Sequence, residues 1–285
     1  MPPTPRARRW VEAEVGSGSK VTGVRRLGGG TSSGVHAIDV LLSGGSTVQF
    51  VLRRHLLFSW LQEEPDLAEK EARNLQLLER SGVAAPRLVA VDADGATCDV
   101  PAVLMTRIPG RRLLKPRNLD RWLRRMAELL PPIHAIDPGS TSVQEWRIWD
   151  DLRDTKPPEW SAHPDVWERL IQVVRRPWPK YSKRFVHRDF QHYNVLWQRG
   201  QPVALDWINA SMGPVELDYG HFRHNLVVDF GFEVAERFHR HYREVVRVQP
   251  DPFWEALNLD PEWARTKIQR REMDSYARSL LAKLS

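Results

Sequence analysis

The chain has 285 residues, a formal net charge of +6 and a pI near 9.7. Its 41% hydrophobic content suffices for one large domain or two lobes, and no apolar run approaches the roughly 18 residues of a membrane helix. The single cysteine, Cys98, excludes an intramolecular disulfide and clustered-cysteine zinc sites, and it fits a reducing compartment such as the cytoplasm.

Basic proteins attract phosphate groups, whether in nucleic acids or in nucleotides. No nucleic-acid-binding signature accompanies the arginines of this sequence, so we expect a solvated basic surface and no nucleic-acid partner. The first nine residues are basic and rich in proline, and no apolar segment follows them. We therefore expect no signal peptide and a frayed end.

The first part of the chain predicts a small antiparallel sheet. Strands are expected at 21–24, 35–42 and 48–53, where apolar residues partly alternate, and a Gly/Ser turn at 43–46 joins the last two.

One helix and two more strands complete this region. Apolar residues at helical spacing run from 65 to 81, and Gly82 ends the helix. Short apolar strands are expected at 87–91 and 103–105. Residues 1–105 thus form a sheet-rich lobe in this interpretation.

The remaining residues, 106–285, predict a helix-rich lobe, which makes the fold class α+β. The clearest helix spans 119–133, although Pro131 and Pro132 should bend or break it. Further helical patterns occur at 164–176, over much of 216–247 and over 260–283, with short strands around a loop at 185–207. A cleft between two such lobes is a natural place for a nucleotide. Tryptophans at helical spacing are expected in the core: Trp122, Trp167 and Trp263.

Residues 187–194 fit the pattern H-R-D-x-x-x-x-N, which carries a carboxylate and an amide at fixed spacing. Asp189 can accept a proton from a substrate hydroxyl, and the amide oxygen of Asn194 can hold Mg²⁺. Asp206 follows an apolar run and is a second metal-binding acid, unless it is only a turn residue at a strand end. A base followed by two metal ligands predicts phosphoryl transfer of the kinase type.

Residues around this loop are expected to support it. We interpret His187 as structural, with its ring hydrogen-bonded to the backbone. Asp218 either hydrogen-bonds into the loop or is an ordinary acid at a helix N-terminus. His192 and Tyr193 either cap the loop or border the substrate.

A glycine-rich loop lies between the first two predicted strands. Its small residues allow backbone N–H groups to approach phosphate oxygens, although such loops are also common without a ligand. It lacks the pattern of a Walker-type P-loop. The candidate phosphate contacts are Gly28, Gly29, Gly30, Thr31 and Ser32.

Arg53 ends the return strand and can touch nucleotide phosphates while pairing with a helix glutamate. Its alternative is a surface charge beside Arg54. Glu71 is the expected partner, and the nearby rivals are Glu63, Glu64, Glu69 and Glu79.

These residues together resemble the aminoglycoside phosphotransferase family of the protein-kinase-like superfamily. The loop at 187–197 is similar to H-G-D-x-x-x-x-N-V-L-[FW], and 205–207 is similar to the family's I-D-W. Weaker similarities, in order along the chain from about residue 20 to 230, are G-V-x-x-P at 82–86, L-M-x-x-x-x-G at 104–110, L-H-x-x-D at 133–137 and P-x-x-x-D at 214–218.

The resemblance implies a bilobal protein-kinase-like fold that binds ATP or GTP with Mg²⁺. It places Met105 and Arg107 at a hinge beside the nucleotide. The γ-phosphoryl group would pass to a hydroxyl of an antibiotic, of the aminoglycoside or macrolide type, or of a metabolite. The biological role would be antibiotic resistance or metabolism, and a monomer is favoured.

Departures from the family pattern leave the acceptor open. Arg188 replaces the usual glycine, His192 and Tyr193 replace Pro-Gly, and Ile208-Asn209 follows the D-W pair where an acid is common.

Two other functions are alternatives. A protein kinase needs D-F-G and a long activation segment, but Trp207 follows Asp206 and a helical pattern resumes near Glu216. A non-catalytic nucleotide-binding module is disfavoured because all the catalytic acids are present.

Overall fold

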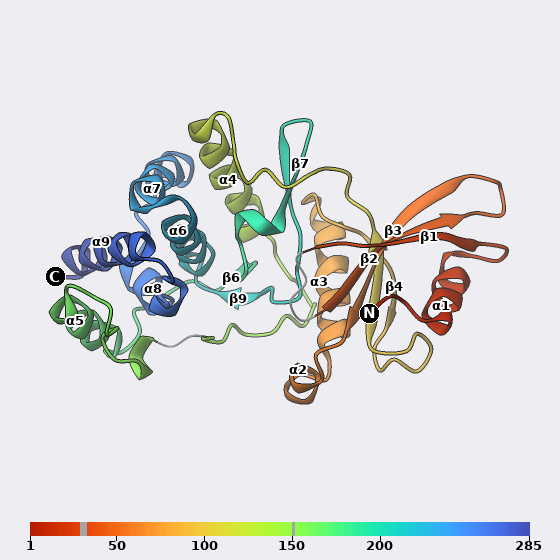
Figure 1. Ribbon diagram of the computed structural model, residues 1–285, viewed down its shortest axis with the longest axis horizontal. Helices are drawn as coiled ribbons and strands as arrows, with labels where there is room; N and C mark the ends of the chain where they lie inside the picture. The colour runs from red at the N-terminus through yellow and green to blue at the C-terminus, as the bar shows by residue number, and fades with distance from the viewer. Residues whose placement is uncertain (29–32, 150–151) are drawn as a thin grey trace. The chain divides into compact units, whose positions relative to one another are not determined.

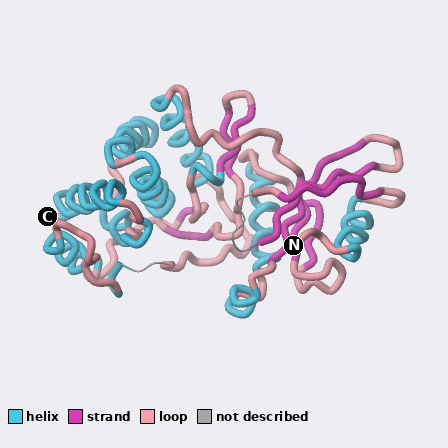
Figure 2. Tube along the Cα trace, viewed as in Figure 1, coloured by secondary structure: helices cyan, strands magenta, loops and turns pink. Residues whose placement is uncertain are grey.

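The computed structural model describes residues 1–28, 33–149 and 152–285 (Figure 1). These divide into two compact units. The first unit contains Met1–Arg111, Pro138–Val143 and Leu205–Asn209. The second contains Arg112–Asp137, Gln144–Ala204 and Ala210–Ser285. Strands dominate the first unit and helices the second (Figure 2), so the predicted α+β class is confirmed.

The first unit is built on an antiparallel sheet of five described strands in the order β1-β2-β3-β5-β4. The predicted hairpin is confirmed, since β2 and β3 pair in register from Ser33↔His55 to Leu41↔Thr47. The strand bounds are β1 Lys20–Arg26, β2 Ser33–Leu41, β3 Thr47–His55, β4 Leu88–Asp92 and β5 Ala102–Thr106.

Helices cover both faces of this sheet. Alternate side chains of a strand point to opposite faces, so each face has side chains that a helix can bury. Helix α1 (Pro5–Val15) packs against β1 and β4 and shares an apolar cluster with Ile38, Leu52 and Leu104. Helix α3 (Leu67–Ser81) contacts β4 and β5.

The prediction of a frayed N-terminus is wrong. The Thr4 hydroxyl caps α1 by accepting from the Ala7 N–H, and Pro5 stands in the first turn. Ala7, Trp10 and Val11 recur at i, i+3 and i+4 and are buried. Three well-placed apolar side chains therefore hold an otherwise basic segment on the sheet.

The predicted helix at 65–81 is confirmed as α3, which ends at Gly82 in the left-handed conformation with φ of 76°. The expectation of a single helix in this region is wrong, since α1 and the short α2 (Phe58–Glu63) are also present.

The second unit contains six α-helices within its described residues. Their bounds are α4 Leu119–His134, α5 Pro164–Val174, α6 Glu216–Phe230, α7 Phe232–Val246, α8 Pro252–Leu257 and α9 Lys267–Leu284. Pro131 and Pro132 do not break α4 as expected, and the helix continues to His134. They stand in its last turn, where few further helical hydrogen bonds are lost, and the Ala135 N–H still bonds the Pro131 carbonyl.

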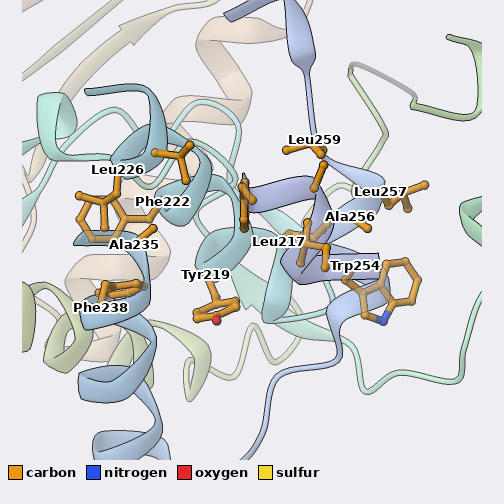
Figure 3. Packing of buried hydrophobic residues seen from close by; sticks show 14 of the residues in the cluster. Leu217, Tyr219, Phe222, Leu226, Ala235, Phe238, Trp254, Ala256, Leu257 and Leu259 are labelled. Atoms are coloured by element: carbon orange, nitrogen blue, oxygen red, sulfur yellow. The ribbon is translucent and has the colours of Figure 1, made fainter. Parts of the chain in front are cut away.

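Helix α6 is the central element of this unit, because it packs against α7, α8 and α9. Figure 3 shows Leu217, Phe222 and Leu226 of α6 packed with side chains of α7 and α8. Arg223 is also buried and bonds Glu255 of α8 and Glu236 of α7. A helix buried on all sides is fixed in rotation, and so are the polar side chains that it carries.

Two small two-stranded sheets position the loop at 187–194. Strand β6 (Arg184–Val186) pairs with β9 (Ser211–Gly213), which the sequence patterns did not reveal, and β7 (Val195–Gln198) pairs with β8 (Gln201–Ala204). None of the helices in the described part of the chain is long and apolar enough to cross a bilayer.

Candidate active site

The loop at 187–194 leaves β6, forms one 3₁₀ turn at His192–Asn194 and enters β7. Val186 is paired with Ser211 before the loop, and Val195 is paired with Ala204 after it. Both ends of the loop are therefore fixed by backbone pairing within the second unit.

Asp189 is held by three side chains. Its Oδ1 accepts from Gln191 Nε2 at 2.6 Å and lies 3.1 Å from His221 Nε2, while its Oδ2 accepts from Asn194 Nδ2 at 2.8 Å. The side chain remains 22% exposed, so a substrate hydroxyl can approach it. Such a fixed, accessible carboxylate suits a proton acceptor.

Asp189 is also ionised at neutral pH. Burial alone would raise the pKa of its carboxyl. The hydrogen bond and charge of His221, the charge of His187 and the Gln191 hydrogen bond outweigh burial and lower this pKa below its usual value.

The loop backbone is fixed by Asp218 in the first turn of α6. Its Oδ2 accepts from the His187 N–H at 2.8 Å and its Oδ1 from the Arg188 N–H at 2.6 Å. His134, at the end of α4, also bonds Asp218 Oδ2 at 2.9 Å. The prediction that Asp218 hydrogen-bonds into the loop is confirmed. The His187 ring accepts from the Asp189 N–H at 3.3 Å, as expected for a structural histidine.

Arg188 occupies the left-handed region with φ of 72°, a conformation that costs an L-residue about 1–2 kcal/mol. Its guanidinium is buried, lies 4.5 Å from the ring centre of Trp149 and donates to the Arg147 carbonyl at 2.6 Å. Burial lowers the pKa of Arg188 to about 10, against the opposing charges of Asp218 and Asp189, so the group stays charged at pH 7.

His192 is packed inside the protein at the end of the loop. Its ring is buried beside Trp122, and its Nε2 lies 3.1 Å from Asp229 Oδ2. Tyr193 is 40% exposed, and its carbonyl accepts from Arg112 Nε at 2.6 Å.

The predicted Arg53–Glu71 pair is confirmed in the first unit. Arg53 Nη1 lies 3.1 Å from Glu71 Oε1 and 2.6 Å from Asp206 Oδ1. The rival Glu64 instead pairs with Lys70. Strand β3 and helix α3 thus fix one cation against two carboxylates.

Glu71 is nearly inaccessible, and burial raises the pKa of its carboxyl to about 7. The charge of Arg53 lowers this pKa, and the like charge of Asp206 raises it. The neighbouring His55 is equally buried. Burial and the charge of Arg53 lower the pKa of His55 to about 3, so it is neutral.

Asn194 and Asp206 supply the oxygen donors that Mg²⁺ prefers. Asn194 uses its amide nitrogen on Asp189, so the amide oxygen is the atom suited to a cation. Asp206 follows β8 in the left-handed conformation, with φ of 67°. Arg53 bonds its Oδ1, and its Oδ2 is the second candidate donor. The donor chemistry therefore fits magnesium.

The other predicted nucleotide contacts have different surroundings. Met105 is buried opposite Val51 in the sheet, and Arg107 bonds Gln49. Gly28 is exposed in a turn after β1. The remaining predicted contacts lie outside the described residues: Gly29, Gly30, Thr31 and Ser32.

The sequence patterns did not identify the residues near Asp189 that are distant from it in the sequence. His221 follows Asp218 by three positions on the same face of α6, and this spacing was the available signal. The rings of Trp149 and Trp263 both contact the His221 ring. Trp122 and Trp167 are core residues as expected, but Trp263 is 38% exposed, so its assignment to the core is wrong.

The sequence model of the phosphotransferase enzyme family matches residues 24–267. The chain belongs to this family. Both the Arg53–Glu71 pair and the loop around Asp189 lie within the matched residues.

Solved structures share the fold at low sequence identity. A thermostable mutant of aminoglycoside phosphotransferase APH(4)-Ia, in a ternary complex with ADP and hygromycin B, has a TM-score of 0.60 and 13% identity, covering 99% of this chain and 98% of the other. The amicoumacin kinase hAmiN, in complex with AMP-PNP, has a TM-score of 0.53 and 16% identity, covering 91% and 81%. The protein-kinase-like fold expected from the sequence is therefore confirmed.

One curated relative shows sequence similarity over a shorter stretch. The N-acetylmuramate/N-acetylglucosamine kinase of Neisseria meningitidis serogroup B is 26% identical over 98 residues. This stretch is 34% of the present chain and 29% of the relative's length.

Proposed function

We propose that the protein is a small-molecule kinase that transfers the γ-phosphoryl group of ATP to a hydroxyl group of its acceptor. The observation that carries this proposal is the arrangement of Asp189. Its carboxylate is ionised, partly exposed and oriented by His221, Gln191 and Asn194. Membership in the phosphotransferase family supports the same reaction.

In the proposed reaction, Asp189 accepts the proton of the acceptor hydroxyl as its oxygen attacks the γ-phosphorus. The bond from the γ-phosphorus to the bridging oxygen breaks, and ADP leaves with that oxygen. Because Asp218 bonds two consecutive backbone N–H groups of the loop, Asp189 enters the reaction already positioned.

Several further residues are assigned to the nucleotide in this proposal. Asn194 and Asp206 would hold magnesium, which neutralises charge on the phosphates when bound. Arg53, kept in place by Glu71, would contact the phosphates. The glycine-rich loop from Gly28, and Met105 and Arg107, remain proposed nucleotide contacts, and GTP is the alternative donor.

The relatives suggest the range of acceptors. The similar proteins include an N-acetylmuramate/N-acetylglucosamine kinase, a phosphotransferase in complex with hygromycin B and an amicoumacin kinase. We accordingly propose an acceptor that is a sugar metabolite or a hydroxyl-bearing antibiotic, and a cytoplasmic enzyme.

The test is Asp189→Asn, with Asp165→Asn as a matched control on an exposed acid in the first turn of α5. ADP release is measured against a panel of sugars, amino sugars, aminoglycosides and macrolides, and ATP binding by calorimetry. Asp189→Asn should lower kcat by about 10²–10⁴-fold with nucleotide affinity retained. Asp206→Ala should instead weaken magnesium-dependent ATP binding. Full activity in Asp189→Asn would refute the assigned base.

A further inference from the structure

Two exposed tryptophans flank the histidine that bonds Asp189. Trp149 is 48% exposed and Trp263 38%, whereas Trp122, Trp167, Trp207 and Trp254 are almost entirely buried. The ring centre of His221 lies 6.4 Å from that of Trp149, at an interplanar angle of 86°. It lies 6.3 Å from that of Trp263, at 81°. Both indoles therefore meet the same imidazole edge to face.

This aromatic group is linked directly to the catalytic carboxylate. His221 Nε2 lies 3.1 Å from Asp189 Oδ1, so each indole is one residue away from the proposed base. Both indoles therefore contact the histidine that orients the proposed base. Exposing this much aromatic surface has no benefit for folding, because apolar surface gains stability only when it is buried.

Both indoles are held in place. Trp263 packs against His224, with ring centres 5.4 Å apart, and His224 is anchored by the Asp260 carbonyl. Trp149 is backed by the guanidinium of Arg188 at 4.5 Å. Rigid aromatic rings of this kind present a preformed surface, which reduces the entropy lost on binding.

The guanidinium of Arg188 disfavours a cationic ligand on the ring of Trp149. Arg188 already occupies a cation–π position on Trp149 and would repel a second cation there. In the part of the chain that the structure describes, Asp189 is the carboxylate that contacts this group, and its oxygens are bonded to His221, Gln191 and Asn194.

We propose that Trp149 and Trp263 form a stacking subsite for a neutral sugar ring that presents a hydroxyl to Asp189. A pyranose has an apolar C–H face that can pack on an indole and a rim of hydroxyl groups that can reach the carboxylate. This inference rests on the proposed kinase activity for the role of the hydroxyl, whereas the binding of the ring can be measured without catalysis.

Binding is tested by saturation-transfer difference NMR on the full chain without nucleotide. The probes are glucose, N-acetylglucosamine, the acyclic polyol glycerol and the polycation kanamycin. The two sugars should show transfer that is strongest at the ring C–H protons of one face. This transfer should be lost in Trp149→Ala and Trp263→Ala, and glycerol and kanamycin should show none that depends on these tryptophans.

Kinetics with MgATP test the same subsite during turnover. Each Trp→Ala variant should raise KM for the better sugar by about tenfold with a smaller change in kcat, and Trp→Phe should recover most of the loss. Phe58→Ala, which removes a 71% exposed aromatic from α2, is the matched control and should leave both constants unchanged. Circular dichroism confirms that each variant is folded.

The outcomes separate the subsite from the kinase activity. Tryptophan-dependent sugar binding supports the subsite even if no compound of the full acceptor panel gives ADP release, a result that would contradict the kinase. ADP release with kanamycin or glycerol at a KM that neither substitution changes supports the kinase and overturns the subsite. Absence of ring-proton transfer from both sugars also overturns the subsite.

Discussion

Asp218 shows how one side chain can determine the geometry of a catalytic loop. Its carboxylate is fully buried and accepts from two consecutive backbone N–H groups and from His134. Burial alone would raise the pKa of Asp218, but the hydrogen bonds and charges of His134 and His187 lower it. The ionised form is therefore the one that matches the site.

Replacing Asp218 with Asn should destabilise the protein and misplace Asp189. The amide keeps one acceptor oxygen and turns an NH₂ toward groups that donate, so about 1.5–3 kcal/mol of stability should be lost. We expect kcat to fall about 10²-fold, because a loop shifted by about 1 Å loses its alignment with the acceptor. Urea unfolding and steady-state kinetics measure the two effects.

The pH dependence provides a check on this prediction. Since the folded pKa of Asp218 is lowered, its stabilisation is present above the unfolded value of 3.8 and is lost as pH falls through the folded value. The stability gap between the wild type and Asp218→Asn should therefore narrow as pH falls below 3.8. Asp165→Asn should change stability by less than about 1 kcal/mol. A gap that does not narrow in acidic solution would contradict this role.

At the scale of elements, helix α1 shows why composition can mislead. The segment is basic and rich in proline, which is typical of a solvated tail, yet Trp10 and its apolar neighbours fill one face of the sheet. The sequence contains the N-terminal signal, Thr4 followed by Pro5, and an apolar spacing of i, i+3, i+4. Because this apolar spacing extends over a single helical turn, packing against the sheet decides whether the segment is helical.

Helix α1 should contribute substantially to the stability of the first unit. Trp10→Ala removes a side chain that is 5% exposed and should cost about 3–5 kcal/mol of stability. Thr4→Ala removes the cap and should cost about 1 kcal/mol. The exposed neighbour Arg9→Ala is the control and should change little. Thermal unfolding of the three variants measures the order of their stability losses. If Trp10→Ala behaved like Arg9→Ala, α1 would not be part of the folded unit.

Elements with long or regular patterns were predictable, and short ones were not. The β2–β3 hairpin and helices α3 and α4 carry repeated apolar spacing over several turns or strand pairs. Strand β9 has three residues and exists because β6 pairs with it. Such an element follows from its neighbours rather than from its own sequence.

At the scale of the whole molecule, buried histidines make stability depend on pH. Burial is the main cause that lowers the pKa of His224 to about 3 and that of His239 to about 4. In the unfolded chain both should titrate near 6.5, so the unfolded state takes up protons that the folded state refuses. The stability that the two neutral histidines contribute to the protein is complete above pH 6.5. It is lost as pH falls from there through their folded pKa values.

At pH 5, His224 and His239 should together take up about two protons when the protein unfolds. This uptake makes the free energy of unfolding change by about 3 kcal/mol per pH unit. The difference in proton uptake on urea unfolding between the wild type and variants of these two histidines, measured by pH-stat titration, tests this value. His224→Gln should reduce the uptake by about one proton. An unchanged uptake in this variant would show that His224 is already protonated in the folded protein.

The candidate site was predictable where its residues are close in sequence or belong to a recurrent spacing. Asp189 and Asn194 belong to one loop, and the partnership of Arg53 with Glu71 followed from the strand and helix that carry them. For His221 the spacing from Asp218 was the available signal, but its contact with Asp189 also depends on the rotation of α6, which the sequence does not show. Trp149 and Trp263 are 114 residues apart in the sequence (263 minus 149), and only the folded second unit brings both to one imidazole.

Arg54 has a practical consequence for protein production. Its guanidinium is buried and bonds Asp99 at 2.7 Å and the carbonyls of Met1 and Pro2 at 2.8 and 2.9 Å. Removing Met1 and Pro2 to aid crystallisation would leave a cation in the interior with two of these three acceptors gone. Recombinant versions of the protein should therefore retain these residues and carry any purification tag at the opposite end of the chain.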